Sequence, residues 1–372
     1  MRILHFVTGG FSGATQVAVD LVRSSLRPGS ATEPLLVLRR KRQADPARTE
    51  ALRASGVPIE TVPGWSHAAT IASLVQVCRR FRPDVLVAHG FSEHLWGRYA
   101  GLIAGVPHLV QVEHNSRERY TRWRLAQARW LGSRTDRIVG VSEGVTQRLR
   151  ELGFAPQRLC TIGNGIDLAP FAQAERHPYA ERMPALLMSA RFSRQKDHAT
   201  LVRALALLRE RGRNVPLRLA GAGSARHRDA LLRLAQDLGV ADRVELLGHR
   251  GDMPALLMAT PICVLSTHHE GMPLALLEGM AAGCAVVASA VPGVRELIRD
   301  GAAGRLVAEG DPAALADAIE ALLRDPAAAA RMADAGRREA VALRGRELML
   351  ASYDELYRSI VAARPAALGA VA

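Results

Sequence analysis

Two glutamates stand eight positions apart in the apolar segment 266–283, which reads STHHEGMPLALLEGMAAG. Glu270 lies between a histidine and Gly271, and Glu278 has small or aliphatic residues one helical turn before and after it. A solvated surface does not require carboxylates in such surroundings. An ionised carboxylate accepts two hydrogen bonds, and glycans and ribose offer pairs of hydroxyl groups. The spacing therefore indicates a site for a hydroxyl-rich ligand, the alternative being incidental positions on a helix surface.

Two cations follow an apolar run in the segment SARFSRQKDHATLV, residues 189–202. Arg191 and Lys196 could neutralise a pyrophosphate at the carboxyl end of a strand, or they could be solvated surface cations. Lys196 draws notice because the chain has only one other lysine, Lys41.

Glycines also follow strand-like runs, as Gly9, Gly10 and Gly13 in TGGFSGATQ and as Gly221 and Gly223 in LAGAGS. Glycines let a backbone approach a ligand closely, and a helix N-terminus favours an anion. The spacing is not GxGxxG, so a dinucleotide fingerprint is absent, and a purely structural turn is an equal alternative.

Histidines occupy two of the predicted strand ends. His114, in VEHNSRERY, is a candidate for binding a hydroxyl or handling a proton, the alternative being a structural histidine. His268, His269 and Glu270 are consecutive, and neighbouring residues of an extended chain point to opposite faces. We therefore expect no metal site there.

Short apolar runs alternate with helical stretches in both halves of the chain, which is typical of parallel sheets covered on both faces. The pattern predicts two doubly wound α/β domains, at 1–168 and 169–349, and an all-helical end of the chain at roughly 312–363. Such sheets bind ligands beyond the carboxyl ends of their strands, so we expect the site in a central cleft where two such edges face each other. The predicted strands are 2–7, 84–88, 107–112, 137–142, 184–190, 215–223, 243–248, 261–267 and 285–289.

Composition limits the class of protein. Of 372 residues, 48% are hydrophobic and 23% charged, which is typical of a globular protein. No run of eighteen apolar residues and no signal-peptide h-region is present, and the four cysteines are scattered. We therefore expect a cytoplasmic protein with reduced thiols. The net charge of +13 is concentrated in residues 1–170, which hold 23 basic and 13 acidic residues, so an anionic partner is expected there.

The ordered set of motifs resembles glycosyltransferase family 4, the retaining nucleotide-sugar enzymes of GT-B fold. The segment Glu270–Glu278 resembles the E-x7-E signature of that family, and SARFSRQKDHATLVRAL resembles its GRLxxxKGxxxLIxA donor segment. TIGNGIDLAPF, LAGAGS, DVLVAHG and VGVSEGV match in order, so the resemblance covers nearly the whole chain. Three departures are Asp197 for the glycine after the lysine, Pro273 for a glycine in the E-x7-E loop, and GGFSG for GGxE in the first loop.

The resemblance implies a role for each candidate residue. Glu270 and His114 would contact the transferred sugar as the catalytic pair, and Glu278 would hold the ribose. The donor diphosphate would meet Arg191, Lys196, Gly9, Gly10 and Gly13. The loop next to the sugar and its phosphate would be Gly271, Met272, Pro273 and Leu274. The base pocket would be lined by Gly221, Gly223, His249 and Arg250. The resemblance also implies that a C-terminal helix of about 350–372 crosses back to the first domain.

The resemblance also implies the reaction: a hexose-type sugar moves, with retained anomeric configuration, from a nucleotide diphosphate sugar to a glycan or lipid-linked acceptor of the cell envelope, such as lipopolysaccharide. No cofactor or metal is expected, because cations and helix dipoles would neutralise the leaving group. A nucleotide-sugar epimerase on the same scaffold is the alternative. A basic nucleic-acid-binding protein is a further one, although no reading element is present.

One segment, RERYTRWRLAQARWLGSRTDR at 117–137, combines aromatic and basic residues. Trp123 and Trp130, with Arg122 and Arg129, recur at helical spacing after Tyr120 and resemble an interfacial helix for anionic lipid. The alternative is a core-facing stripe with a solvated cationic rim. The first interpretation predicts a peripheral protein on the inner face of the cytoplasmic membrane.

Overall fold

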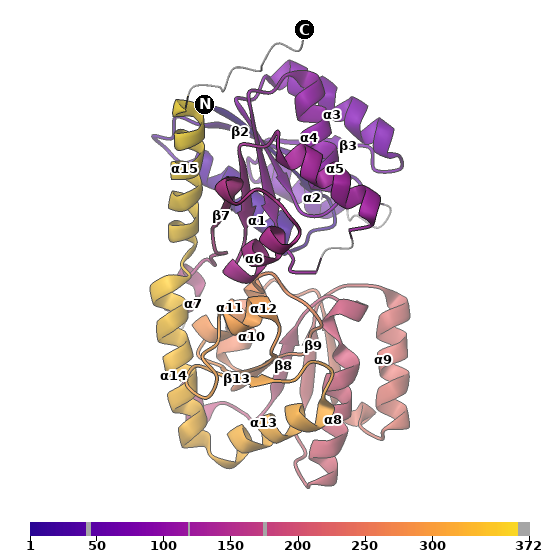
Figure 1. Ribbon diagram of the computed structural model, residues 1–372. Coiled ribbons are helices and arrows are strands. Elements are labelled where there is room, and N and C mark those ends of the chain that lie inside the picture. The colour runs from indigo at the N-terminus through magenta and orange to yellow at the C-terminus, as the bar shows by residue number, and fades with distance from the viewer. Residues whose placement is uncertain (42–45, 118–119, 174–176, 364–372) are drawn as a thin grey trace. The chain divides into compact units, whose positions relative to one another are not determined.

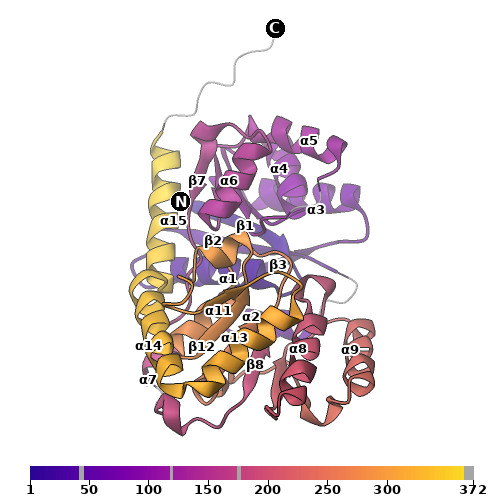
Figure 2. The same ribbon diagram turned by 60° about the horizontal axis from the view of Figure 1, so that its bottom comes forward.

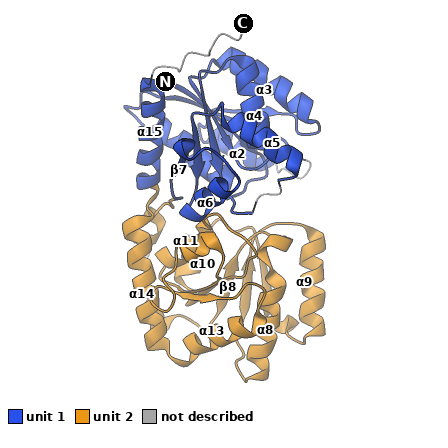
Figure 3. Ribbon diagram, in the orientation of Figure 1, with its two compact units in different colours: residues 1–164, 347–372 blue, residues 165–346 orange. Residues whose placement is uncertain are grey.

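The computed structural model describes residues 1–41, 46–117, 120–173 and 177–363, and the chain divides into two compact α/β units (Figures 1 and 3). Unit 1 comprises residues 1–164 and 347–372, and unit 2 comprises residues 165–346. The boundaries predicted from the sequence lie between residues 168 and 169 and between residues 349 and 350. The end of the predicted final helix, 364–372, lies outside the described residues.

Unit 1 is built on a seven-stranded parallel sheet in the order β3-β2-β1-β4-β5-β6-β7. The order reverses direction between β1 and β4, which is the doubly wound pattern expected from the sequence. The strands are β1 (Arg2–Thr8), β2 (Glu33–Arg39), β3 (Ile59–Val62), β4 (Val85–His89), β5 (His108–Glu113), β6 (Arg137–Gly140) and β7 (Leu159–Thr161).

Helices cover both faces of this sheet because successive strand residues point to opposite sides. Leu4, Phe6 and Leu86 belong to one buried cluster, which also contains residues of α3, and Val7 and Leu38 belong to another, with residues of α1. The helices are α1 (Gly13–Ser25), α2 (Pro46–Ala54), α3 (His67–Phe81), α4 (Glu93–Ala104), α5 (Arg122–Gly132) and α6 (Glu143–Glu151).

Unit 2 repeats the architecture with a six-stranded parallel sheet in the order β10-β9-β8-β11-β12-β13. Helices α8 and α13 pack side by side against it, as Figures 1 and 2 both show. The strands are β8 (Leu186–Ser189), β9 (Leu217–Ala220), β10 (Val244–Gly248), β11 (Ile262–Leu265), β12 (Ala285–Ser289) and β13 (Arg305–Val307). The helices are α7 (Ala169–Gln173), α8 (His198–Glu210), α9 (Ala225–Asp237), α10 (Met253–Met258), α11 (Leu274–Ala281), α12 (Pro292–Arg295), α13 (Pro312–Arg324) and α14 (Pro326–Leu343).

The last helix, α15 (Arg346–Ala362), belongs to unit 1 from Glu347 onward, as the predicted return requires. It buries Tyr353, Tyr357 and Ile360, and the Tyr357 ring meets that of His5 on β1 edge-on, with centroids 6.1 Å apart. Glu347 also accepts two hydrogen bonds from Arg27, at 2.6 and 2.7 Å.

All four cysteines are free, as predicted, and three of them are buried. Within the described residues, no helix has both the length and the apolar character needed to cross a membrane.

Candidate active site

The predicted residues of unit 2 follow the carboxyl ends of four adjacent strands. Arg191 and Lys196 follow β8, Gly221 and Gly223 follow β9, His249 and Arg250 follow β10, and Glu270 follows β11. Because β8 and β11 are neighbours at which the strand order reverses, Lys196 and Glu270 lie at the topological switch point, where open α/β sheets bind their ligands.

Lys196 and Glu270 form a direct ion pair, with Lys196 Nζ 2.5 Å from Glu270 Oε1. Thr267 Oγ1 donates to the same carboxylate oxygen at 2.7 Å. The Lys196 and Glu270 side chains are only 16% and 8% exposed, so little solvent reaches them and each charge is stabilised mainly by the other. The pair provides one cation and one carboxylate side by side at the sheet edge.

The backbone conformation of Asp197 accounts for one departure from the family pattern, an aspartate where glycine is usual. Its φ is +33°, in the left-handed region that glycine adopts readily and that aspartate tolerates better than most residues. It is also the N-cap of α8, with its carboxylate accepting hydrogen bonds from the Thr200 backbone N and, at 2.6 Å, from Thr200 Oγ1. The carboxylate thus compensates for the strain that a side chain brings to this position.

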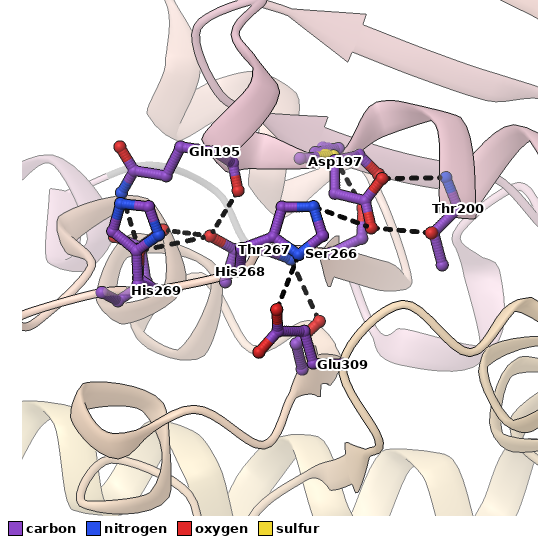
Figure 4. Close-up of polar contacts among 11 residues, drawn as sticks. Gln195, Asp197, Thr200, Ser266, Thr267, His268, His269 and Glu309 are labelled. Atoms are coloured by element: carbon purple, nitrogen blue, oxygen red, sulfur yellow. Dashed lines mark hydrogen bonds and ion pairs between the residues drawn. The ribbon is translucent and has the colours of Figure 1, made fainter. Parts of the chain in front are cut away.

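His268 connects this turn to a more distant segment of unit 2 (Figure 4). Its Nδ1 lies 2.8 Å from Glu309 Oε1 and its Nε2 lies 3.7 Å from Asp197 Oδ2. Gln195 Nε2 donates to His269 O at 2.7 Å, and His268 N donates to Gln195 O at 2.9 Å. The loops after β8 and β11 are therefore fixed to each other by backbone and side-chain bonds.

The E-x7-E segment forms a loop and a short helix. Gly271 and Met272 are buried, Leu274 is half-buried, and Pro273 is the N-cap of α11. The segment from Glu270 to the helix start is thus a compact turn at the end of β11.

Glu278, on α11, has no hydrogen-bond partner for its carboxylate among the described residues. Burial raises the pKa of Glu278 from 4.5 to about 7. A half-buried carboxylate without a protein partner is a ready acceptor for the hydroxyl groups of a ligand.

This shifted pKa makes stability depend on pH. The native state holds the Glu278 proton up to about pH 7, whereas the unfolded chain loses it near pH 4.5, so rising pH destabilises the protein between these values. We expect Glu278→Gln, which cannot ionise, to raise the Tm relative to wild type at pH 8 and to give little difference near pH 4.5. Exposed Glu355 provides the control Glu355→Gln. A Tm difference that did not vary with pH would contradict the assignment.

The other predicted residues of unit 2 are more peripheral. Arg191 is exposed, and His249 and Arg250 are exposed after β10, with Arg250 paired to Asp252 at 2.5 Å. Gly221 and Gly223 have φ of +147° and +158°, and a Cβ on either would collide with the backbone after β8. Backbone packing therefore explains why glycine occupies both positions, and their place in a base pocket remains a prediction.

In unit 1 the first glycine loop joins β1 to α1. Gly9 N donates to Arg39 O at 2.9 Å, and a Cβ on Gly9 would lie 2.9 Å from that same oxygen, so this position requires glycine for packing. Gly10 and Gly13 are exposed, and Ser12 caps α1. A cavity of about 250 Å³ lies between α1 and α2, next to this glycine loop. It is lined by Phe11, Ser12, Thr15, Gln16, Val19, Arg23, Arg48, Ala51 and Leu52.

His114 follows β5 and belongs to a row of three histidines. Its Nε2 lies 3.2 Å from His89 Nδ1, and His89 Nε2 lies 3.1 Å from His5 Nδ1. Burial lowers the pKa of His114 to about 3, so the ring is neutral near pH 7. A neutral imidazole suits hydroxyl binding better than donation of a stored proton.

The aromatic helix differs from the expectation in one respect. α5 begins at Arg122, so Tyr120 precedes it, and the Tyr120 hydroxyl instead meets His94 Nε2 at 3.0 Å. Trp123 and Trp130 are 73% and 48% exposed, so they do not form a core-facing stripe. Arg134 lies over the Trp130 ring at 4.0 Å, and Arg129 Nε donates to Leu152 O at 2.6 Å. Residues 118–119 of the segment lie outside the described residues.

Over the described residues, no group of three or more histidine, cysteine, aspartate or glutamate side chains could hold a metal ion. Five residues that make these contacts are not among the residues predicted from the sequence: Gln195, Thr267, Glu309, His5 and His89. Thr267 is the last residue of the predicted strand 261–267, and His89 directly follows the predicted strand 84–88, so position at a strand end was the available signal.

Two family models match the chain and together cover most of it. Residues 11–170 match Glycosyltransferase Family 4, and residues 172–339 match Glycosyl transferases group 1.

Three similar proteins match over nearly their full length. The chain is 28% identical to the lipopolysaccharide core biosynthesis glycosyltransferase LpsE of Rhizobium meliloti, over 96% of this chain and 99% of LpsE. It is 28% identical to the D-inositol 3-phosphate glycosyltransferase of Nocardiopsis dassonvillei, over 98% and 93% of the two chains. The fold is similar to that of Anabaena HepE in complex with UDP-glucose, with a TM-score of 0.84, 22% identity, and coverage of 96% of this chain and 100% of HepE.

Proposed function

Since this chain belongs to glycosyltransferase family 4, we propose that it moves a hexose-type sugar, with retention of anomeric configuration and without a metal, from a nucleotide diphosphate sugar to a glycan or lipid-linked acceptor of the cell envelope. The observation that carries the donor assignment is the Lys196–Glu270 pair at the switch point of unit 2. Eight residues after Glu270 lies Glu278, whose carboxylate has no partner in the part of the chain that the structure describes. LpsE, named for lipopolysaccharide core biosynthesis, supports the acceptor class.

Each candidate side chain of unit 2 has a role in this reaction. Lys196 and Arg191 neutralise the diphosphate, whose negative charge grows as the sugar leaves. Glu270 accepts hydrogen bonds from hydroxyls of the transferred sugar, and Glu278 accepts them from the ribose. In the same-face reaction expected for the family, the departing phosphate takes the acceptor proton, so no protein nucleophile is required.

Unit 1 supplies features suited to an acceptor with negative charge. Arg23 and Arg48 line the cavity beside the first glycine loop, and the Arg48 guanidinium lies over the Phe11 ring at 4.5 Å. The cavity therefore combines cations with apolar surface. His114, neutral at the end of β5, would bond a sugar hydroxyl.

A ligand panel tests the donor site directly. We expect a UDP-sugar, tested beside GDP- and ADP-sugars in the presence of a chelator, to raise the Tm of the wild type, because a ligand that binds only the native state stabilises it. HepE was crystallised with UDP-glucose, so UDP-glucose is the first probe. The shift should fall strongly in Glu278→Ala and persist in the control Glu355→Ala. No shift with any nucleotide sugar would remove the donor assignment.

We also propose that α5 contacts an anionic membrane. Trp123 and Trp130 expose aromatic surface beside Arg122 and Arg124, the combination that binds lipid headgroups. We expect the protein to sediment with phosphatidylglycerol vesicles at low salt and much less with phosphatidylcholine alone. Trp123→Ser should lower the sedimented fraction several-fold, while the control Met183→Ser, also at an exposed apolar residue, should not. Absence of sedimentation at low salt would rule this contact out.

A further inference from the structure

His5, His89 and His114 form a continuous hydrogen-bonded chain through unit 1. His5 Nδ1 and His89 Nε2 are 3.1 Å apart, and His89 Nδ1 and His114 Nε2 are 3.2 Å apart. His5 and His89 are at most 1% exposed, and the rings of the three residues follow one another at 5.4 and 5.5 Å between centroids. The chain thus leads from the interior of the sheet to its carboxyl edge.

The register of the sheet produces this arrangement. His5 on β1 lies beside Val87 on β4, and His89 lies beside Val112 on β5. Residues two apart on a strand share a face, so His5, His89 and His114 share one face and each stands two residues nearer the carboxyl edge than the last. The three histidines form a staircase across three adjacent strands.

Burial keeps all three rings neutral. It lowers the pKa of His5 and of His114 to about 3 and that of His89 well below its ordinary value, to which the two neighbouring histidines also contribute. The aromatic group that meets His5 from the covering helix is Tyr357, whose ring lies edge-on. Each imidazole therefore carries one proton on one of its two nitrogens.

This condition couples the three tautomers. His89 must donate through one nitrogen and accept through the other. If His89 Nδ1 carries the proton, it donates to His114 Nε2, and His5 Nδ1 must donate to His89 Nε2. All three rings are then protonated on Nδ1. In the reverse case all three are protonated on Nε2, and mixed arrangements break at least one bond.

We propose that His5 and His89 are positioning residues that fix the tautomer and ring orientation of His114, and so decide whether its Nδ1 donates to or accepts from a sugar hydroxyl. The part of this inference that concerns sugar rests on the proposed function, whereas the coupling of tautomers does not. A buried residue two strands away thereby controls the hydrogen-bonding character of a group at the sheet edge.

The first test is a long-range ¹H–¹⁵N correlation spectrum of the full chain with ¹⁵N-labelled histidine at pH 7. We expect His5, His89 and His114 to show one and the same neutral tautomer, with assignments from single histidine variants. Exposed His227, outside the chain of bonds, is the reference for a free ring. Different tautomers among the three residues would overturn the proposal. The spectrum is that of the unsubstituted protein, with variants used for assignment alone, and it requires no substrate.

The second test breaks the chain at its buried end. His5→Phe keeps a ring of similar size but no hydrogen bond, so His114 should change to a mixture of tautomers. His5→Gln returns a hydrogen-bonding group to His89 Nε2, so the His114 spectrum should return toward that of the wild type. An unchanged His114 spectrum in His5→Phe would contradict the coupling.

Kinetics then separate this inference from the proposed function. With a UDP-sugar that the wild type transfers, we expect His5→Phe to lower kcat about 10-fold, recovered in His5→Gln, while the Tm shift caused by the nucleotide stays unchanged. An undiminished kcat would refute the effect on sugar binding. If no sugar is transferred by the wild type, the proposed function fails, and the tautomer measurement still decides the coupling.

Discussion

Lys196→Met is expected to lower kcat/KM for sugar transfer by about 100-fold to 1,000-fold, the range found when one preorganised electrostatic contact to a transition state is removed. Methionine retains most of the volume of lysine but not its charge. The exposed neighbour Arg194 offers the matched control, because Arg194→Met removes a cation without disturbing the ion pair.

The same substitution should also destabilise the protein, by about 3 kcal/mol, because Glu270 is left with a buried charge and, among the described residues, the Thr267 hydroxyl as its one remaining hydrogen-bond partner. We expect the double variant Lys196→Met with Glu270→Gln to regain much of this stability without regaining activity. Calorimetric unfolding of the two single variants and the double variant measures the coupling. Equal losses of stability in the Lys196→Met single and double variants would contradict the pair as a source of stability.

Arg98→Met should destabilise unit 1 by about 3–5 kcal/mol. Arg98 is fully buried on α4 and donates to His94 O at 2.8 Å, to His94 Nδ1 at 2.7 Å and to Thr135 Oγ1 at 3.1 Å. Burial lowers the pKa of Arg98 to about 10, so the side chain stays charged near pH 7, with buried Glu113 among the groups that favour this charge. Its removal leaves several buried polar groups unsatisfied.

The tryptophans make this measurement selective. All four, at positions 65, 96, 123 and 130, belong to unit 1, so urea unfolding followed by tryptophan fluorescence monitors that unit. Arg98→Lys keeps the charge but not the three-way geometry and should lose an intermediate amount. Arg148→Met, which removes an exposed pair with Glu151, should change stability by no more than about 1 kcal/mol. A comparable effect of Arg98→Met and Arg148→Met would contradict the role of burial.

Much of the fold can be predicted from apolar periodicity, because parallel strands buried on both faces are short continuous apolar runs. The predicted strands include β1, β4, β8 and β11, whose ends carry most of the candidate site. The predicted set omits β2, although PLLVLR is an apolar run of the same kind. β3, β7 and β13 are not continuous buried apolar runs, because each contains exposed or half-buried residues, so the same signal does not find them.

The candidate site was likewise predictable in part. Strand-end position and residue type are enough to select Lys196, Glu270 and Glu278. They are not enough to predict that Lys196 and Glu270 bond each other, because this depends on β8 and β11 being neighbours in the sheet. The left-handed backbone of Asp197 is likewise invisible in a pattern of residue types, although the family resemblance marks the position as unusual.

The return of α15 to unit 1 determines which of the two units can complete its fold first during synthesis. The residues that complete the core of this unit follow all of unit 2 in the chain, so during synthesis the first 164 residues must wait while 182 more are made. Until then the side of β1 that carries His5 lacks the cover of Tyr357. Unit 2 is continuous and has no such wait, so the second unit to be synthesised can be the first to finish folding. A chain cut after residue 346 would leave unit 1 permanently at the unfinished stage and dependent on protection from aggregation.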